Sequence, residues 1–342
     1  MIDLFSDTRT QPSAGMRRFM AEAEVGDEQA DLDPTVTALC ERVADLLGKE
    51  KAVYLPSGTM CNEIAYRVHC RPGDEIILDR TAHGIIAEAG GPAALALAML
   101  YPLDGERGQF SPGQVEGAVR SGSRYEPRSR LISIEQTSNW GGGSIWPLET
   151  IGAIGEIARA RGLAMHMDGA RLMNAVVESG IEARAYAKPF DTLWLDFSKG
   201  LGAPVGAVLA GSADFIHEAW RLKQQMGGAM RQAGIIAAAC LYALDHNIDR
   251  LSEDHANAKR LARGLAEMNG IHLDPGLIET NIIFFDLGSS APTARSVAAR
   301  LLESGVRIGA MGERRMRAVT HLDVDGAAID RALSAMADAL RG

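Results

Sequence analysis

The sequence predicts an α/β protein in which a mainly parallel sheet is covered by helices, with a smaller α+β domain at the C-terminus. Short apolar stretches alternate with amphipathic ones along most of the chain, as in sheets whose strands are joined by helices. The chain has 342 residues, 46% of them hydrophobic, so it can bury a large core. From about residue 270 the order of strands and helices changes, which indicates the second domain.

The order of elements predicts three parts. Residues 1–30 are expected to form an N-terminal arm that is too short to hold a core of its own and packs across a neighbour or a subunit interface. Residues 31–247 are expected to form the large domain. Residues 248–342 are expected to form a connecting amphipathic helix and the small C-terminal domain.

The first long helix is expected to begin at Pro34. Asp33 before it is a typical N-cap, proline is favoured in the first turn, and Gly48 ends the apolar pattern. Its apolar face, which is predicted to belong to the core, is formed by Val36, Leu39, Val43, Leu46 and Leu47.

A short strand at 52–55 is predicted to run into a turn of small residues, Ser57, Gly58 and Thr59, which begins the next helix. This turn places backbone N–H groups and two hydroxyls at a helix N-terminus, where the helix dipole favours an anion such as phosphate. An ordinary capped helix start is the alternative interpretation of these residues alone.

The next buried strand, residues 75–79, is followed at its C-terminal end by His83. A histidine there can stack on a flat ring and take part in proton transfer, although most single histidines make structural hydrogen bonds only. Further strands are expected at 95–101 and 130–135, and further helices at 112–120 and 148–161.

Two charged residues end neighbouring strands of the predicted sheet. Asp168 follows the apolar residues 163–167, and Lys199 follows the buried strand 193–197. Ligands bind at this edge of an open α/β sheet. A desolvated lysine can attack a carbonyl as a free amine, and an aspartate can keep a pyridine nitrogen protonated. Together the two residues predict a Schiff-base lysine and a pyridoxal-phosphate site. Alone, Lys199 is more simply interpreted as a surface lysine, and Asp168 equally well as a helix N-cap.

The pattern after Lys199 predicts one more strand of the sheet, a long amphipathic helix that connects the domains, and the elements of the small domain. The strands are expected at 205–210, 281–287, 306–310 and 316–321, and the helices at 213–225, 231–245, 248–268, 292–304 and from 326 onward.

Charge and cysteine content narrow the function classes. The net charge of −9 and the absence of basic clusters argue against nucleic acid or an anionic membrane as partner, which leaves small molecules. The longest apolar run, residues 233–244, is too short to span a membrane and the N-terminus lacks a secretory pattern, so we expect a cytoplasmic protein. No metal site is expected, and reduced core thiols are predicted for Cys40, Cys61, Cys70 and Cys240.

A series of short motifs follows in order along nearly the whole chain: Asp3-Leu4-x-Ser6-Asp7-Thr8, Asp33-Pro34-Thr35-Val36, Pro56-Ser57-Gly58-Thr59, Ala82-His83, Glu88-Ala89-Gly90-Gly91, Asp168-Gly169-Ala170-Arg171, Ser198-Lys199-Gly200-Leu201-Gly202, Gly227-Gly228-x-Met230-Arg231-Gln232, Glu253-Asp254-His255 and Thr320-His321-Leu322-Asp323. In this order they resemble the low-specificity L-threonine aldolase family of fold-type I pyridoxal-phosphate enzymes. The resemblance implies a mainly parallel sheet of the seven-stranded type with a smaller C-terminal domain, and a homotetramer built as a dimer of dimers with shared active sites.

The resemblance also implies a role for individual residues. Lys199 would form the Schiff base with the cofactor, Asp168 would bind its pyridine nitrogen and His83 would stack on its ring, so these three are the expected catalytic residues. Further cofactor contacts are expected from Ser57, Gly58, Thr59, Arg171 and, across a subunit interface, Arg231. The amino-acid substrate is expected to contact Ser6, Ser138, Arg171 and Arg317.

The reaction that the resemblance implies is retro-aldol cleavage of an L-β-hydroxy-α-amino acid to glycine and an aldehyde. Threonine, allo-threonine and bulkier analogues are the candidate substrates. A β-eliminating lyase, dehydratase or racemase that uses the same cofactor is the first alternative, and a binding protein without catalysis is the second. The products distinguish the aldolase from the first alternative, because elimination gives a keto acid and ammonia instead of glycine and an aldehyde.

The sequence departs from the family pattern around the substrate. Ser138 stands where relatives have a histidine thought to contact the β-hydroxyl, and Gly84 and Ala87 stand where relatives have bulky residues. We therefore expect extra space beside the substrate's β-carbon and a preference for a substrate bulkier than threonine, with Trp140 or Met165 as lining residues. The alternative is that Trp140 or another side chain fills this space.

Overall fold

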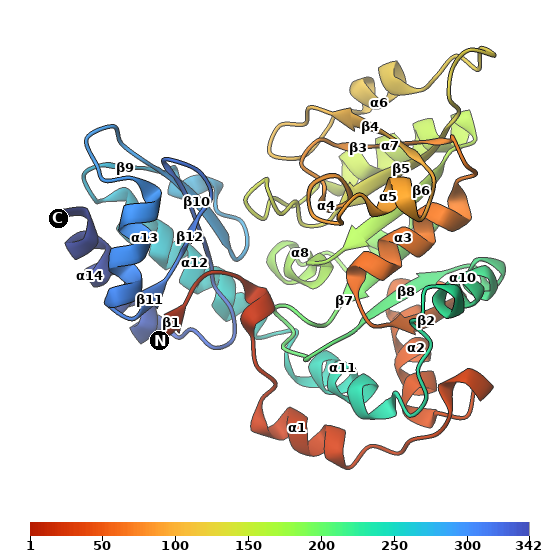
Figure 1. The fold of residues 1–342 in the computed structure, drawn as a ribbon, viewed down its shortest axis with the longest axis horizontal. Coiled ribbons are helices and arrows are strands. Elements are labelled where there is room, and N and C mark those ends of the chain that lie inside the picture. The colour runs from red at the N-terminus through yellow and green to blue at the C-terminus, as the bar shows by residue number, and fades with distance from the viewer. Residues whose placement is uncertain (342) are drawn as a thin grey trace.

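A seven-stranded sheet lies at the centre of the computed structural model, which describes residues 1–341 (Figure 1). Its strands, in spatial order, are β2 (Lys51–Leu55), β8 (Ala207–Gly211), β7 (Thr192–Asp196), β6 (Ala164–Gly169), β5 (Ser129–Glu135), β3 (Glu75–Asp79) and β4 (Met99–Leu103). The pairs from β7 to β4 are parallel, and β8 is antiparallel to both of its neighbours. The prediction of a mainly parallel sheet is thus confirmed.

Helices connect these strands and cover the sheet. They are α2 (Pro34–Leu47), α3 (Gly58–His69), α4 (His83–Ile86), α5 (Gly91–Ala94), α6 (Pro112–Ala118), α7 (Leu148–Arg161), α8 (Leu172–Ser179), α9 (Ala183–Ala187), α10 (Ala213–Gln225) and α11 (Gly234–His246). Asp33 caps α2 by accepting from the Val36 N–H, and Gly48 ends it in the left-handed conformation, as the sequence predicts.

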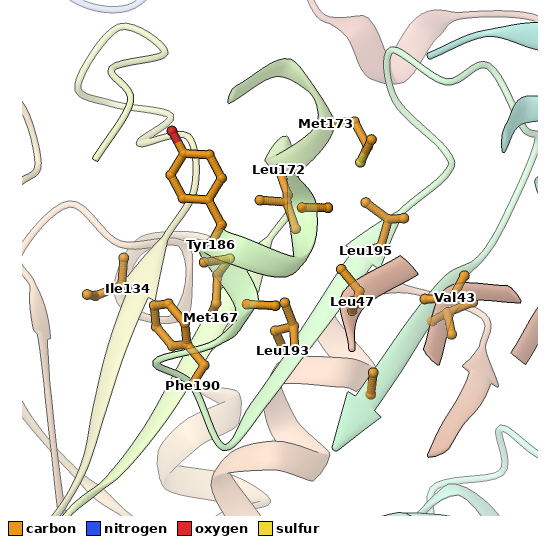
Figure 2. Close-up of a cluster of buried hydrophobic side chains, with 14 of the residues drawn as sticks. Val43, Leu47, Ile134, Met167, Leu172, Met173, Tyr186, Phe190, Leu193 and Leu195 are labelled. Carbon is orange, nitrogen blue, oxygen red and sulfur yellow. The ribbon is translucent and has the colours of Figure 1, made fainter. Parts of the chain in front are cut away.

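Successive side chains of β7 point to opposite faces of the sheet, as they must in an extended strand. Leu193 and Leu195 belong to the large core cluster on one face, where Figure 2 shows them beside Met167 and side chains of α8. Trp194 packs on the other face, in a smaller cluster with residues of α3 and α10. Because both faces are buried, β7 reads in the sequence as a continuous apolar run.

The C-terminal region forms an antiparallel four-stranded sheet in the order β12-β13-β10-β9, with its own hydrophobic core, which confirms the expected small α+β fold. Its strands are β9 (Ile271–His272), β10 (Ile282–Leu287), β12 (Gly309–Ala310) and β13 (Arg315–Val319). Its helices are α12 (Leu251–Ala266), α13 (Ala294–Glu303) and α14 (Gly326–Arg341). The exact boundaries of the three expected parts stay a prediction.

The N-terminal segment contacts both regions of its own chain. Strand β1 (Ile2–Asp3) pairs in parallel with β11 (Val306–Arg307), and Leu4 is buried in the core of the C-terminal region. Helix α1 (Ala14–Ala21) lies against α11, as Figure 1 shows. Residues 2–21 thus contact both the C-terminal region and helix α11 beside the large sheet, a role that the sequence did not reveal.

Two expected elements differ from the structure. The strand expected at 306–310 is two short strands, β11 and β12, because its halves pair with different partners, β1 and β13. The strand expected at 95–101 begins later, as β4, because α5 and the turn after it occupy the preceding residues. The short helices α4, α5, α8 and α9 were not expected, since they are too short for a helical period to be read.

Within residues 1–341, no helix is both long enough and apolar enough to cross a membrane.

Candidate active site

A cavity of about 380 Å³ lies at the C-terminal ends of β5, β6 and β7. Each of these strands places a carboxylate on its lining: Glu135, Asp168 and Asp196. Lys199, in the turn after β7, lines the same cavity. Because β6 and β7 are parallel neighbours, their C-terminal ends meet at one edge, and the structure brings Lys199 and Asp168 together there.

Lys199 is surrounded differently from what we expected. Its Nζ lies 2.8 Å from Asp196 Oδ2 and 5.5 Å from the centre of the Trp194 ring, so a carboxylate as well as an apolar ring faces the amine. The Thr10 hydroxyl donates to the Lys199 carbonyl oxygen at 2.8 Å and fixes the backbone of this turn. The lysine is thus held as part of an ion pair, not isolated among apolar groups.

Asp168 is a buried carboxylate that lines the cavity. It accepts hydrogen bonds from the Asn62 side chain at 2.9 Å and the Ala170 N–H at 3.0 Å. Burial raises its pKa, and the charges of His83 and Lys199 act in the opposite direction. Within the described chain no Lys or Arg side chain forms an ion pair with Asp168, so it can receive a cationic group from a ligand.

The orientation of the Asn62 amide follows from its neighbours. Trp194 Nε1 donates to Asn62 Oδ1 at 2.7 Å, and an indole N–H can only donate. The Asn62 NH₂ group must therefore face the carboxylates, where it donates to Asp168 and to Glu88 Oε1. Asn62 holds the two carboxylates apart and positions both of them.

His83 begins the short helix α4 and lines the cavity. Its backbone N–H donates to Glu135 Oε2 at 2.9 Å, and its Nδ1 lies 2.7 Å from Glu88 Oε1. The hydrogen bond with Glu88 raises the pKa of His83, whereas burial lowers it. Ligand atoms of His83, Glu88 and Asp168 lie within 4.8 Å of one another, but the Asn62 NH₂ points between the carboxylates and would repel a metal cation there.

The N-terminus of α3 forms one wall of the cavity. Ser57 caps this helix by accepting from the Met60 N–H, and Ser57, Gly58 and Thr59 all line the cavity. A Cβ at Gly58 would come within 2.1 Å of the Trp194 ring, so only glycine allows the helix start to lie over the indole. In residues 1–341, no hydrogen bond engages the N–H of Gly58 or Thr59, which leaves both donors for an anion.

Two arginines reach the cavity and differ in what they contact. Arg171 donates from Nε and Nη2 to Asp7, so its side chain is already paired. Arg317 donates from Nη2 to Asn139 Oδ1 at 2.7 Å, and its buried Nε has no hydrogen-bond partner within the described residues. Burial, with repulsion from Arg171, lowers the pKa of Arg317 to about 10. Ser6 lines the cavity beside them.

Arg231 does not line the cavity of its own chain. Its side chain is 62% exposed and lies 2.8 Å from Asp27, in the segment between α10 and α11. The same segment is held by Glu28, which accepts from the Met230 N–H and from the buried Lys223. Arg231 therefore projects outward from an ordered turn, and its expected contact with a neighbouring subunit stays a prediction.

The residues expected to widen the pocket are only partly at the site. Ser138 does not line the cavity, because its Oγ turns back to accept from the Gly141 N–H at 3.2 Å. Met165 is on the opposite side of the sheet, in the large core cluster. Trp140 and Ala87 do line the cavity, and Trp140 stacks on Phe284 at 5.6 Å. Trp140 also lines a second cavity, of about 420 Å³.

Sequence reasoning missed several groups of the site: Asp7 as the partner of Arg171, Asn62, Glu135 and Asp196, and the contact of Glu88 with His83. Asp196 could have been found, because it ends the same buried strand that precedes Lys199. Glu135 could have been found in the same way, because it ends β5. Asp7 contacts Arg171 across 164 residues, and Asn62 contacts Glu88 and Asp168 across 26 and 106 residues, so no local pattern reveals these pairs. Glu88 lies only five residues from His83, a spacing that is typical of neither a helix face nor a strand face.

The residues present fit pyridoxal phosphate. Asp168 is a buried carboxylate without a cationic Lys or Arg partner, which suits a protonated pyridine nitrogen. The two N–H donors at the start of α3 suit a phosphate, and the Lys199 amine, which lines the same cavity, suits an aldehyde. The donor set at this cavity thus matches the cofactor that the sequence predicts.

Comparison with known proteins agrees with this geometry. The family model described as "Beta-eliminating lyase" matches residues 3–287. "Low-specificity L-threonine aldolase 1" of Arabidopsis thaliana is 38% identical, with 99% of this chain and 96% of that protein aligned. "Low specificity L-threonine aldolase" of Escherichia coli K12 is 40% identical, with 95% of each chain aligned.

Solved structures share the fold at low sequence identity. Threonine aldolase of Leishmania major has a TM-score of 0.84 and 18% identity, with 99% of this chain and 100% of that one covered. Serine palmitoyltransferase of Sphingomonas wittichii has a TM-score of 0.77 and 18% identity, with 99% and 87% covered. At 18% identity, the similarity to these two structures shows a shared fold and nothing more.

Proposed function

The chain belongs to the beta-eliminating lyase family, and from this premise we propose that it cleaves L-β-hydroxy-α-amino acids to glycine and an aldehyde. It is a pyridoxal-phosphate-dependent lyase of fold type I. The observation that carries the proposal is Lys199 and Asp168 in one cavity, at the ends of adjacent parallel strands. Relatives aligned over almost the full chain, with the names of L-threonine aldolases, support it.

The cofactor would be held at three places. The Lys199 amine would bind its aldehyde carbon, Asp168 would accept from its ring nitrogen, and the N–H groups of Gly58 and Thr59 with the Ser57 hydroxyl would bind its phosphate. Pyridoxal phosphate supplies an aldehyde that binds amines and a ring that accepts the electrons released when a bond to Cα breaks. His83 lines the cavity next to Asp168 and would lie against the ring.

The substrate carboxylate would be bound chiefly by Arg317. Its buried Nε lacks a partner within residues 1–341, and a planar guanidinium binds a carboxylate through two parallel hydrogen bonds. Arg171 and Ser6 would flank this contact. Fixing the carboxylate orients the Cα–Cβ bond relative to the ring, which sets the bond that breaks.

His83 would take the proton from the β-hydroxyl. Its Nδ1 is engaged by Glu88, and its Nε2 has no hydrogen-bond partner among the described residues, so Nε2 is available to the substrate. Glu88 would stabilise the imidazolium that forms. Removal of this proton allows the β-carbon to leave as an aldehyde.

We infer a homotetramer with sites completed across subunits, and a cytoplasmic location. The support for shared sites is Arg231, which is exposed on a turn that Glu28 and Asp27 hold in place. In a neighbouring subunit its guanidinium would reach the phosphate end of the cavity. A fully active monomer would contradict this arrangement.

A β-eliminating lyase, dehydratase or racemase is the second candidate function, favoured by the description of the matching family model. Incubation with threonine, allo-threonine and phenylserine decides between them. Glycine and an aldehyde in equal amounts support the proposal. A keto acid with ammonia, or the D-isomer of the substrate, would contradict the proposal and support the second candidate function. Lys199→Ala is the inactive control in each incubation.

A further inference from the structure

Glu63 and Glu88 form a pair of buried carboxyl groups behind His83. Glu63 lies on α3 and is 1% exposed, and Glu88 lies between α4 and α5 and is 5% exposed. The Glu63 carboxyl lies against Gly91, whose N–H donates to the Glu88 carbonyl oxygen at 2.8 Å, and Asn62, next to Glu63 on α3, donates to Glu88 Oε1. The two carboxyl groups are therefore neighbours, and burial together with Glu88 raises the pKa of Glu63. Neither lines the cavity, so any effect on the reaction passes through the side chains that Glu88 contacts, His83 and Asn62.

The oxygens of this pair have few other partners. Glu88 Oε1 receives hydrogen bonds from Asn62 and His83, at 2.7 Å each. Glu88 Oε2 and both oxygens of Glu63 are buried and, in the part of the chain described, meet no donor. Each of these three oxygens would be a desolvated acceptor if both groups were ionised.

Two ionised carboxylates in contact inside a protein are very unfavourable, because each loses hydration and repels the other. No Lys or Arg of residues 1–341 forms an ion pair with either group. One shared proton resolves both problems, since it removes a charge and supplies a donor for Glu88 Oε2. Paired carboxyl groups elsewhere behave in this way.

We propose that Glu63 is a neutral carboxylic acid that donates a hydrogen bond to Glu88, and that the pair holds His83 with a proton on Nδ1 and a free Nε2 facing the cavity. The proposal rests on the role of His83 in the proposed function. Glu63 and Glu88 are then positioning residues: the first keeps the second ionised, and the second sets the tautomer and the proton affinity of His83.

The other titratable groups around the pair agree with this assignment. They are Asp168 and Glu135, which face His83; Lys199, which faces Asp168; and Tyr66 and Cys61 on α3. Burial raises the pKa of both Tyr66 and Cys61 well above the usual values, so these two stay neutral. Burial and Glu88 likewise raise the pKa of Glu63.

The proton balance of the reaction is simple. The β-hydroxyl O–H bond breaks, its proton bonds to His83 Nε2, and the positive charge that forms on the ring lies against Glu88. The proton of Glu63 remains on the pair throughout. Without it, Glu88 would keep a buried oxygen with no donor, and its negative charge would be less stable opposite His83.

The direct test is infrared spectroscopy of the enzyme with its cofactor at pH 7. A neutral carboxylic acid has a carbonyl stretch that a carboxylate lacks. The difference spectrum between the parent and Glu63→Gln should show the loss of one such band. Glu75→Gln is the matched control, because Glu75 is equally buried but paired with Arg120 at 2.8 Å and should show no loss.

The link to His83 is tested by its titration. Carbethoxylation of His83 at a series of pH values, measured by peptide mass spectrometry, gives an apparent pKa for this residue. In the parent, this pKa should agree with the one that the pH profile of kcat gives. Glu88→Gln and Glu63→Leu should lower the apparent pKa of His83 by about one to three units. Glu63→Gln, whose amide still donates to Glu88, should keep the parent profile.

Two results would overturn the proposal. One is the absence of a neutral carboxyl band that Glu63→Gln removes. The other is a His83 titration that is the same in Glu88→Gln and Glu63→Leu as in the parent. If the parent makes no glycine and aldehyde, the proposed function fails instead, and the infrared and carbethoxylation results still decide the state of the pair.

Discussion

Arg171 donates from Nε and Nη2 to the two carboxylate oxygens of Asp7, at 2.7 Å each, and both side chains are buried. Asn281, just before β10 of the C-terminal sheet, donates to the same carboxylate at 3.1 Å. Asp7 therefore connects the end of β6 in the large sheet with the C-terminal region. Burial would raise its pKa, but Arg171 outweighs burial and holds the pKa well below the usual range.

Asp7→Asn is expected to destabilise the protein by about 3–5 kcal/mol, because it leaves Arg171 as a buried charge without its carboxylate. Denaturant unfolding near pH 7 measures this. Since the pKa of Asp7 is depressed, its contribution is present above the usual carboxyl pKa and is lost as the pH falls through the depressed value. Asp3→Asn is the control, because Asp3 pairs with the more exposed Arg307, and an equal loss in both variants would contradict the argument.

Arg317→Ala is expected to raise KM for the amino-acid substrate by roughly 10- to 100-fold, the worth of a charged hydrogen-bond pair. The reason is that Arg317 has a buried Nε free for the carboxylate, whereas Arg171 is paired with Asp7. Steady-state kinetics with threonine measures the effect. Arg315→Ala, two residues away and stacked over Phe284 instead, should leave KM nearly unchanged.

Lys199→Ala is expected to lose covalent cofactor attachment and turnover, because the amine that lines the cavity is gone. The visible absorption of the purified protein, and the mass of the protein after borohydride reduction, report attachment. Lys188→Ala, at an exposed helix end, should behave as the parent. A reduced cofactor adduct that persists in Lys199→Ala would show that another lysine is used.

Asp168→Asn is expected to keep bound cofactor and to lose activity on the order of 100-fold or more, because an amide does not keep the ring nitrogen protonated. The Asn62 and Ala170 donors that now serve Asp168 remain in place. Cofactor content and kcat are measured on the same preparation. A kcat close to that of the parent, with full cofactor occupancy, would show that Asp168 is not needed to keep the ring nitrogen protonated.

Trp140→Ala is expected to shift substrate preference toward phenylserine relative to threonine by about 10-fold, because Trp140 lines both the active-site cavity and the second cavity of about 420 Å³, and removal of its side chain leaves room for a larger β-substituent. The measured quantity is the ratio of kcat/KM for the two substrates. Ser138→Ala should leave this ratio within about two-fold, since Ser138 faces Gly141 and not the cavity. A larger change of this ratio in Ser138→Ala than in Trp140→Ala would show that Ser138, and not Trp140, controls the size of the pocket.

The parts of the site that the sequence could predict are those carried by strand ends and a helix start. Asp168 and Lys199 each follow an apolar run, and parallel strands must bring such ends to one edge. Ser57 is a local cap, so its position follows from the sequence that surrounds it.

The parts that the sequence could not predict depend on side-chain direction or on distant contacts. Ser138 was placed in the pocket from a motif position, but its hydroxyl turns to a backbone N–H in the same loop, and Trp140 reaches the cavity instead. Asp7 contacts Arg171 across 164 residues, and Glu63 meets Glu88 only because α3 packs beside α5. Such pairs are set by tertiary packing and have no period or spacing in the chain.

The reversed direction of β8 has a thermodynamic consequence for the reactive lysine. β7 and β8 are antiparallel neighbours, so the connection 197–206 that carries Lys199 leaves and re-enters the same sheet. It is closed by hydrogen bonds from the Phe197 N–H to the Gly206 carbonyl and from the Ala203 N–H to the Phe197 carbonyl. Ordering this segment costs conformational entropy, and this cost is incurred during folding, before any ligand binds. Binding at Lys199 therefore does not have to offset the same cost again.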